Sequence, residues 1–549
     1  MPITKNNCSD HKKNLLSSLN KNKKLIFWVI IILLLFTGTW LRFYKLNQLP
    51  FGLNKIESHN AIRAIDFSDE NESFIKNNSF TYISEHLTLL SFDFFGINIF
   101  ALRFISSILG TLTLLGFIFL LKELKFSRRL IPLGTFFLAF SFWHISLSRN
   151  GQIDALIPFL IIVISTLLLR GINNKKYLQF SVAGILLGTS TWLHHLGIVI
   201  SIPIIFSLLC FITLNKKNFS TLRYKFLIFI LLTLFFSIPL FLQLKQNPEL
   251  LIETYKTNLG IEKTNLLNFQ SIITCISSVF YTGDFNQTNN PLRLPLIPFA
   301  WSILFILGLI ISFKELFVLF FKRKSFIPKN ILAILFSFSN ILAMIFLLLL
   351  SKNTFLSSKN LILIIPSILV LCLIPFEYFS QVYQKLKLSN RLYMKKWRWK
   401  IIQASLLGIL VSILISGFSQ IHLYFQIWPN SNEAKIVFQK KELTFGKIIK
   451  SIERKKNNFI ILPQSVIDSK RNSIANIDAI RFIGFPEIKH YQFLNQEEGT
   501  NQTHCKESLF VFYEIDDFMR KQFQKKCPEN KFQEISSYNE KEVFWTMKE

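Results

Sequence analysis

The sequence lacks the glycine-rich phosphate loops of nucleotide-binding proteins. Neither G-x-G-x-x-G nor G-x-x-x-x-G-K-[ST] occurs among its 549 residues, and these are the patterns whose backbone N–H groups cradle a nucleotide phosphate. This absence argues against an ATP-driven pump. No internal repeat of the kind that marks many secondary transporters is evident either.

Cysteine is also scarce. The six cysteines are scattered without C-x-x-C spacing, so the sequence indicates neither a zinc site nor a disulfide framework. Cys210, Cys275 and Cys372 lie in or near apolar segments. Only Cys505 and Cys527, in the polar C-terminal tail, are candidates to pair with each other.

Acidic residues are few relative to basic ones: 33 Asp and Glu against 62 Lys and Arg give a net charge of +29. The basic residues fall mostly in short clusters between apolar runs, which is typical of cytoplasmic loops and not of a nucleic-acid-binding surface. Half of the chain is hydrophobic, with 59 phenylalanines. A polytopic α-helical membrane protein with membrane lipids as partners, and no nucleic acid, is therefore expected.

The first apolar run, LIFWVIIILLLFTGTW, lacks a small-x-small cleavage site and is long enough to span a bilayer. We expect an uncleaved helix after a basic, cytoplasmic N-terminus over 1–24. About eleven spans follow from the hydropathy pattern, and every strongly basic loop then falls on the cytoplasmic side. The number of spans can differ from eleven by one or two, because 86–100 is apolar enough to enter the bilayer. The expected spans are 25–40, 101–121, 130–147, 153–170, 177–193, 196–214, 226–244, 294–313, 331–351, 360–381 and 401–419.

This threading divides the chain into a multi-pass domain over 25–419 and a tail over 420–549. Polar loops 43–85 and 245–293 lie outside by parity. In the tail, charges become frequent and short apolar runs at 459–463 and 509–513 alternate with helix-like stretches. The tail is therefore expected to be a small extracytoplasmic α/β domain of a protein in the cell membrane.

Three acids are candidates for catalysis because they lie where an apolar segment meets a polar one. Glu57 follows the first span, Glu85 precedes an apolar stretch, and Asp154 begins another span. A carboxylate near the membrane is costly to desolvate and is a functional candidate by default, whereas the acids in the middle of 43–85 are explained by solvation.

Cations at predicted outer helix ends form a second group, against the positive-inside trend. Such side chains bind lipid phosphates, although a single one often only extends to the headgroups. They are Arg103, Arg149, Lys352 and Lys359.

The histidines carry weaker signals. His194 and the adjacent His195 point in different directions on a helix and do not easily share one metal ion. His144 is expected to be an interfacial residue beside Trp143. A divalent cation held jointly by Glu57, His59, Glu85 and His86 stays open as an alternative, without a specific spacing to support it.

Several stretches, in their order and spacing, resemble the family 39 glycosyltransferases, the bacterial protein-mannosyltransferase-like group related to the aminoarabinose transferases that modify lipid A. The resemblance covers about 25–380, and the tail matches only in position. It rests on F-G-L-N-K-I-E-S-H-N-A, E-H-L-T-L-L-S-F-D-F-F-G-I-N-I-F-A-L-R-F, F-W-H-I-S-L-S-R-N-G-Q-I-D-A-L-I-P-F, A-G-I-L-L-G-T-S-T-W-L-H-H and F-L-S-S-K-N-L-I-L-I-I-P-S.

The resemblance implies a C-type fold and an inverting transfer of a sugar from a polyprenyl-phosphate carrier to an unknown acceptor outside the membrane, without a nucleotide. An acid in the first outer loop would act as general base, and outward cations would stabilise the leaving phosphate. Arg149 and Asp154 match the family's second-loop Arg and Asp. His194 falls where a Lys or Tyr often contacts the phosphate.

One departure from the family is important. The family usually has an Asp-Glu pair in the first loop, and Ile56 takes the Asp position while Glu57 matches the Glu. Three interpretations follow: Glu57 is the base, with His59 as a partner; Glu85 takes over; or transfer activity is lost. A non-catalytic glycolipid-binding relative is therefore the main rival, ahead of a transporter or flippase.

Overall fold

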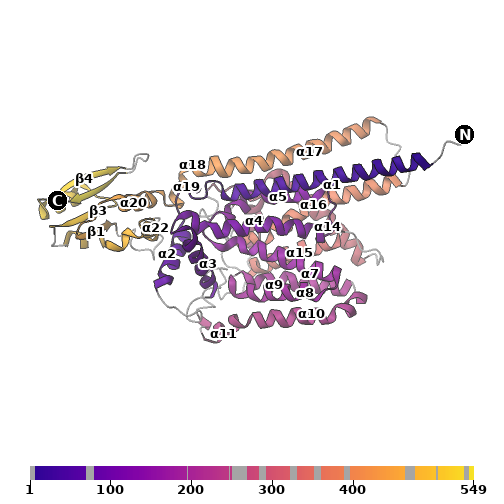
Figure 1. The fold of residues 1–549 in the computed structure, drawn as a ribbon, viewed down its shortest axis with the longest axis horizontal. Helices are drawn as coiled ribbons and strands as arrows, with labels where there is room; N and C mark the ends of the chain where they lie inside the picture. Colours follow the sequence, from indigo (N-terminus) through magenta and orange to yellow (C-terminus); the bar gives the residue numbers. More distant parts are fainter. Residues whose placement is uncertain are drawn as a thin grey trace.

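The computed structural model describes residues 6–69, 79–194, 196–214, 216–246, 248–249, 269–283, 292–321, 330–350, 360–388, 396–463, 477–501, 505–536 and 543–548. A helical bundle and a small sheet domain at the C-terminal end follow one another along the long axis of the molecule (Figure 1). The helices up to the end of the bundle are α1 Asn6–Phe43, α2 Lys55–Asp69, α3 Ser79–Phe95, α4 Ile99–Glu123, α5 Leu130–Phe140, α6 Phe142–Ser148, α7 Leu156–Asn174, α8 Tyr177–Leu193, α9 Gly197–Leu214, α10 Lys216–Phe236, α11 Ile238–Gln246, α13 Phe269–Phe280, α14 Phe299–Phe321, α15 Ile331–Leu350, α16 Ile365–Leu388 and α17 Lys396–His422.

The multi-pass helical architecture is confirmed. Within the described residues, eight helices are long and apolar enough to cross a membrane, and the bent pair α5–α6 makes a ninth if it counts as one span. The shorter helices α8 and α9 occupy the two other predicted spans. Each of the eleven predicted segments thus contains a helix, although fewer than eleven helices are long and apolar enough to be identified as membrane spans by those criteria alone.

The bundle is held by close approach as well as by apolar side chains. In α8, Gly184 and Gly188 are four residues apart, and an added Cβ would lie 2.6 Å from the carbonyl oxygen of Phe229 and 2.5 Å from that of Thr233, both in α10. Small residues at this spacing let two helix backbones meet, which is how helices associate where lipid removes the hydrophobic driving force. The stretch A-G-I-L-L-G is therefore a packing motif here.

The polar segment 43–85 is not simply a loop, because it contains α2 and the start of α3. Asn54 caps α2: its side-chain oxygen accepts from the backbone N–H groups of Ile56 and Glu57 at 3.0 and 2.9 Å. Glu57 returns the contact by accepting from the Asn54 N–H at 3.0 Å. This reciprocal pair is a capping box, which fixes where the helix begins.

The tail folds as the predicted α/β domain. Its five strands lie in the order β2-β1-β3-β5-β4, with β1 parallel to β2 and β3, and β5 antiparallel to β3 and β4. β1 and β3 contain the two apolar runs recognised in the sequence. The elements of the tail are a π-helical turn Leu423–Ile427, α18 Trp428–Asn430, α19 Asn432–Val437, α20 Lys440–Ser451, β1 Asn457–Leu462, α22 Ile477–Ile483, β2 Gln492–Asn495, α23 Gln496–Asn501, β3 Ser508–Phe512, α24 Asp517–Lys526, β4 Lys531–Ser536 and β5 Val543–Lys548.

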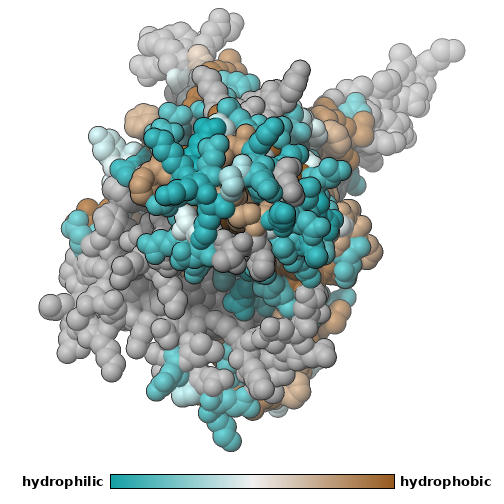
Figure 2. Space-filling model, turned by 90° about the vertical axis from the view of Figure 1, so that its left-hand side faces the viewer, coloured by the Kyte–Doolittle hydropathy of each residue, from teal (hydrophilic) through white to brown (hydrophobic). Residues whose placement is uncertain are grey.

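Both faces of this sheet are covered. Alternate residues of β1 point to opposite sides, so Ile460 packs with Phe445 of α20, whereas Phe459 packs in a second cluster with Phe523 of α24. A disulfide joins Cys505 to Cys527, as the sequence allowed. Viewed from this end, the described surface is predominantly hydrophilic (Figure 2).

Helix α2 joins the bundle to the sheet domain. Phe482 of α22 lies in one buried cluster with Leu53, Ala61 and Ile65, and its ring centroid is 5.9 Å from that of Phe92. The sheet domain therefore docks on α2 and α3, directly beside residues 54–60 (N-K-I-E-S-H-N) at the start of α2.

Candidate functional site

Glu57 is fully buried, and protein donors surround its carboxylate. Oε1 accepts from Arg103 Nε at 3.0 Å and from the Gly151 N–H at 2.6 Å. Oε2 accepts from the Asn54 N–H at 3.0 Å and from Arg103 Nη2 at 3.3 Å. A carboxylate offers about four lone-pair positions, and all four are occupied here. In this structure, every lone-pair position of the Glu57 carboxylate therefore faces a protein donor.

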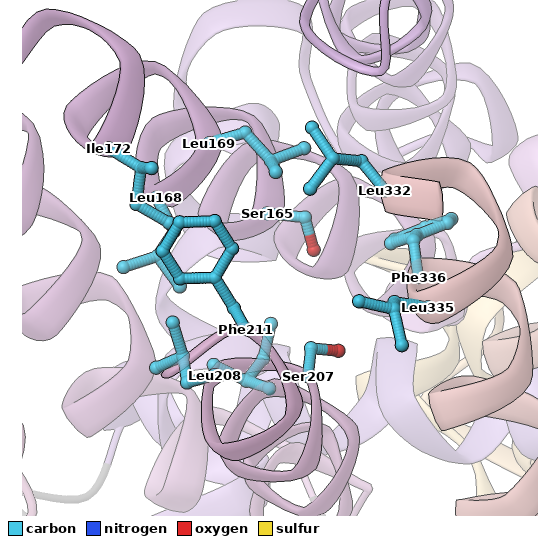
Figure 3. A pocket seen from close by; sticks show the side chains of 11 residues that line it. Ser165, Leu168, Leu169, Ile172, Ser207, Leu208, Phe211, Leu332, Leu335 and Phe336 are labelled. Carbon is cyan, nitrogen blue, oxygen red and sulfur yellow. The ribbon is translucent and has the colours of Figure 1, made fainter. Parts of the chain in front are cut away.

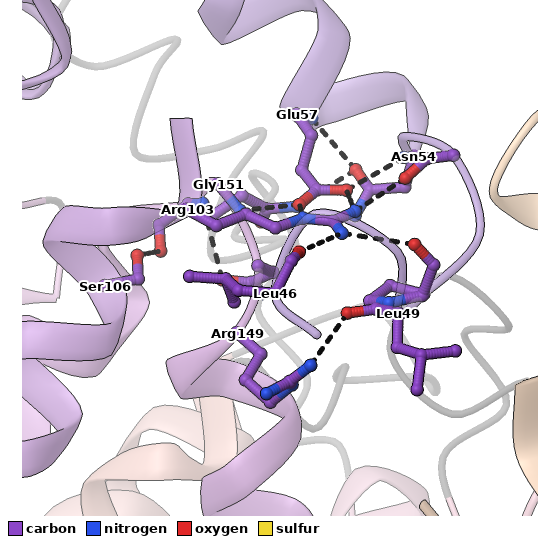
Figure 4. A network of polar contacts seen from close by, with 12 residues as sticks. Leu46, Leu49, Asn54, Glu57, Arg103, Ser106, Arg149 and Gly151 are labelled. Carbon is purple, nitrogen blue, oxygen red and sulfur yellow. Dashed lines mark hydrogen bonds and ion pairs between the residues drawn. The ribbon is translucent and has the colours of Figure 1, made fainter. Parts of the chain in front are cut away.

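Arg103, on α4, is equally committed. Besides Glu57, it donates to the carbonyl oxygens of Leu46 and Pro50 at 3.2 and 3.1 Å through Nη1 and of Gly52 at 2.6 Å through Nη2. Figure 4 shows this guanidinium enclosed by the chain between α1 and α2. All five N–H groups of the side chain have acceptors, and the residue is 0% exposed. Arg103 orders the segment between α1 and α2, and all of its donors are used within the protein.

Arg149, at the end of α6, binds backbone carbonyls in a similar way. Its Nη1 donates to the carbonyl oxygens of Leu41 and Arg42 at 2.8 and 3.0 Å, and its Nη2 to those of Tyr44 and Leu49 at 2.8 and 3.1 Å. The hydroxyl of Tyr424, from the π-helical turn after α17, accepts from Nε at 3.2 Å. The side chain thus closes the C-terminal end of α1 and ties it to the start of the tail.

Sequence analysis missed a third buried arginine, and the interpretation of its neighbour is corrected. Arg42 Nη2 lies 2.7 Å from Nδ1 of His144, which is 1% exposed, and Trp143 is 3% exposed. Neither ring lies at an outer surface of the bundle, so the expected interfacial histidine beside an aromatic-belt residue is wrong. The signal available in the sequence was the position of Arg42 at the outer end of an apolar run, the same feature that singled out Arg103.

Asp154 and His194 come together from separate elements. Asp154 lies in a 3₁₀ turn, Ile153–Ala155, before α7, and His194 ends α8; Oδ1 of the carboxylate is 3.3 Å from Nε2 of the imidazole. Nδ1 of His194 accepts from the Leu196 N–H at 3.1 Å, so the neutral ring carries its proton on Nε2 and donates it to Asp154. Both residues are buried, at 2% and 8% exposure.

The other two candidates on α2 and α3 contact different partners. Glu85 Oε1 lies 2.8 Å from Nε of Arg63, whose side chain is 35% exposed. His59, 58% exposed, has its Nδ1 3.2 Å from Oδ2 of Asp478 in α22. His59 therefore marks the contact between α2 and the sheet domain.

The four residues of the possible divalent-cation site, Glu57, His59, Glu85 and His86, face different partners in this structure. Glu57 faces Arg103, Glu85 faces Arg63, His59 faces Asp478, and His86 packs edge-on against Phe67 at 4.7 Å. No group of three or more His, Cys, Asp or Glu suited to a metal ion occurs in the described parts of the chain. His195, Lys352 and Lys359 lie outside the described residues, and their roles stay predictions.

A gap between α7, α9 and α15 is not a substrate site. It has a volume of about 50 Å³, and Figure 3 shows it lined by aliphatic side chains, Phe211 and Phe336, with Ser165 and Ser207 as its hydroxyls. Oγ of Ser207 already lies within hydrogen-bond distance of Oγ of Ser339, at 2.8 Å, and of the Pro203 carbonyl oxygen, at 2.7 Å. A space of this size holds only water-sized molecules.

The comparisons with known proteins agree with this architecture. Residues 76–250 match the family model described as dolichyl-phosphate-mannose-protein mannosyltransferase. The resemblance to the family 39 glycosyltransferases is confirmed. The matched segment contains Glu85, Arg103, Arg149, Asp154 and His194, whereas Glu57 and His59 precede it and Lys352 and Lys359 follow it.

Solved structures extend the likeness to most of the chain. ArnT from Cupriavidus metallidurans bound to undecaprenyl phosphate is 11% identical and has a TM-score of 0.50, with 95% of this chain and 98% of that chain covered. Its apo form is 10% identical with a TM-score of 0.51, covering 96% of this chain and 98% of that one. At these low identities, the likenesses show the fold of this chain alone. No curated protein sequence matches significantly.

Proposed function

We propose that the chain is an inverting glycosyltransferase that moves a sugar from a polyprenyl-phosphate-linked donor to an acceptor at the outer face of the cell membrane. The observation that carries this proposal is the family match over 76–250, because that segment supplies most of the polar residues of the site. The similar ArnT structure is bound to undecaprenyl phosphate, which supports a carrier of that chemical class.

The Asp154–His194 pair is the best candidate for the acid–base chemistry. Inverting transfer needs a base that takes the proton of the acceptor hydroxyl as the sugar carbon is attacked, while the carrier phosphate leaves. Oδ1 of Asp154 lies 3.3 Å from Nε2 of the His194 imidazole, whereas the carboxylate of Glu57 accepts from four protein donors. The carboxylate of Asp154, oriented by His194, acts as the base in this proposal.

Glu57 and Arg103 are positioning residues in this scheme. The ion pair fixes the first turn of α2 to α4, and the bond from the Gly151 N–H to Glu57 Oε1 at 2.6 Å links that turn to the loop before Asp154. The geometry of the base therefore depends on Glu57, even though Glu57 does not touch the substrate. Lys352 and Lys359 stay the candidates for the carrier phosphate, because Arg103 and Arg149 donate to protein oxygens throughout.

The sheet domain is placed outside the cell in this proposal, with the N-terminus in the cytoplasm. Two independent features support this orientation. Lys122, Lys125, Arg128 and Arg129 lie at the end of α4 and the start of α5, away from the sheet domain, as the positive-inside rule requires. The disulfide between Cys505 and Cys527 belongs in an oxidising compartment.

The test is transfer of labelled sugar from membrane polyprenyl-phosphate donors by the purified protein in liposomes, comparing wild type with Asp154→Asn, Glu57→Gln and Glu85→Gln. A lost general base lowers kcat by about 10²–10⁴-fold. We expect Asp154→Asn to show this loss with an unchanged melting temperature and loss of the pH dependence of kcat. Full turnover in Asp154→Asn would reject it as the base and return the role to Glu57 or Glu85.

A non-catalytic glycolipid-binding protein is the second candidate, and one observation favours it. Ile56, in the position of the family's Asp, is 40% exposed on the first turn of α2, so an apolar side chain stands where a carboxylate would face the substrate. Saturable binding of a polyprenyl glycolipid, with no turnover by wild type or by Ile56→Asp, would favour this candidate. Turnover gained only in Ile56→Asp would show an intact site that lacks its base.

A further inference from the structure

A groove of about 870 Å³ lies between α1 and α5, at the end of the bundle away from the sheet domain. These two helices run side by side there (Figure 1). The groove is unrelated to the Asp154–His194 pair, which lies at the other end of the bundle. It is lined by Lys23, Lys24, Ile26, Phe27, Ile30, Arg128, Arg129 and Pro132.

One half of the lining is entirely cationic. Each helix brings an adjacent basic pair, Lys23 and Lys24 from α1, and Arg128 and Arg129 from the turn before α5, and all four side chains are exposed. No carboxylate in the described parts of the chain pairs with any of them. Four like charges around one groove repel each other unless an anion lies between them.

The other half is apolar and faces outward. Ile26 and Ile30 follow Lys23 and Lys24 by a few residues along α1 and are 57% and 41% exposed. α1 is a peripheral span, with only 17% of its apolar window buried in the protein. An occupant of the groove therefore touches cations at one end and lies along an apolar helix face at the other.

We propose that this groove binds an anionic phospholipid of the leaflet on the side opposite the sheet domain. The lipid phosphate lies among the two lysines and two arginines, and an acyl chain lies against Ile26, Phe27 and Ile30. Basic pockets between membrane helices recognise phosphate headgroups in this way, and arginine is suited to a phosphate because its guanidinium donates two parallel hydrogen bonds.

The alternative is a general basic rim, in which every cation at this end acts equally. The chain offers a matched control, since Lys122, Lys125, Lys175 and Lys176 are exposed cations at the same end of the bundle that do not line the groove. A groove variant K23Q/K24Q/R128Q/R129Q and a rim variant K122Q/K125Q/K175Q/K176Q remove the same charge.

The test measures the dissociation constant of dioleoylphosphatidylglycerol for the full-length protein in a neutral detergent, by titration followed with native mass spectrometry. We expect the groove variant to lose at least tenfold in affinity and the rim variant less than twofold. Equal losses in both variants overturn the proposal, and so does retained affinity in the groove variant. Melting temperatures check that both variants are folded. If the quadruple groove variant does not fold, the double variant K23Q/K24Q takes its place.

Three competitors separate the sources of phosphate. Dioleoylphosphatidylcholine should bind at least tenfold more weakly, because its headgroup carries no net charge. Glycerol phosphate should not displace the lipid, because it lacks the chain that lies against Ile30, and Ile26→Ser/Ile30→Ser should weaken lipid binding. Displacement by glycerol phosphate at equal concentration, or tighter binding of a polyprenyl phosphate than of the phospholipid, contradicts a phospholipid site.

Discussion

Ion pairs hold α2 on two sides, and the two sets of pairs differ in burial: those toward α4 are buried, whereas those toward the sheet domain are exposed. Toward α4, Glu57 and Arg103 are both 0% exposed and lie 3.0 Å apart, with every donor and acceptor used. Toward the sheet domain, His59 faces Asp478 at 58% and 17% exposure, and Arg481 lies 3.7 Å from Asp66 at 40% and 52%. A buried pair is costly to break because one charge is left in a low dielectric, whereas an exposed pair exchanges its partner for water.

This contrast predicts the largest effect for Arg103→Met. The substitution leaves the Glu57 carboxylate buried without its cation and should lower the free energy of unfolding by about 3–5 kcal/mol. Chemical denaturation in detergent measures the change, and Glu57→Gln combined with Arg103→Met should recover part of it. Arg481→Met, which removes an exposed ion pair, is the matched control. If Arg103→Met lowers the free energy of unfolding no more than Arg481→Met does, the buried and the exposed ion pairs of α2 do not differ in their contribution to stability.

Arg149→Lys tests whether the shape of the buried cation matters as well as its charge. Lysine keeps the charge but has three donors from one atom, so it cannot reach the carbonyls of Leu41, Tyr44 and Leu49 together with Tyr424. We expect a loss of about 1.5–3 kcal/mol, the value of a hydrogen bond to a charged group. Wild-type stability in Arg149→Lys would mean that charge alone holds this loop.

A buried polar group on the side of the sheet domain should behave differently again. Tyr491 is 6% exposed, and its hydroxyl has no hydrogen-bond partner in the described part of the chain. Tyr491→Phe removes an unsatisfied hydroxyl and should leave stability unchanged or raise it by about 1 kcal/mol. A loss of more than that amount would reveal a partner for the hydroxyl.

The same residue gives a pH dependence with a definite sign. Burial raises the pKa of the Tyr491 phenol above its ordinary value, with Arg454 opposing and Glu487 adding to the shift. A pKa raised by folding contributes stability that is complete below the unfolded value of about 10 and is lost as pH rises through the folded value. Melting temperatures between about pH 9 and 11 should therefore fall more steeply in the wild type than in Tyr491→Phe.

The smallest effect is expected for the exposed pair that joins α2 to α22. His59→Gln and Asp478→Asn should each lower stability by about 0–1 kcal/mol and should show a coupling energy that disappears in high salt. A double-mutant cycle at two salt concentrations measures this. A coupling above about 2 kcal/mol that persists in salt would mean that the pair behaves like the buried one.

The sequence by itself determined the spans, the α/β tail and the family resemblance. Hydropathy is a local sum over about twenty residues and needs no knowledge of partners. The short apolar runs at 459–463 and 509–513, which lie largely in β1 and β3, are local signals of the same kind. The capping box of Asn54 and Glu57, which the structure revealed, is likewise local, since the two residues are three apart. These features depend on near neighbours in the chain.

Only the tertiary structure decided what the charged residues do. Arg103 meets Glu57 across 46 residues and Arg149 meets Tyr424 across 275, and no local pattern encodes such partners. Glu57, Arg103 and Arg149 therefore stood out as candidates for chemistry, and the structure adds that their polar atoms contact other protein groups. The energy of a charge in a membrane protein depends on how completely distant donors and acceptors satisfy it, and that is a property of the fold.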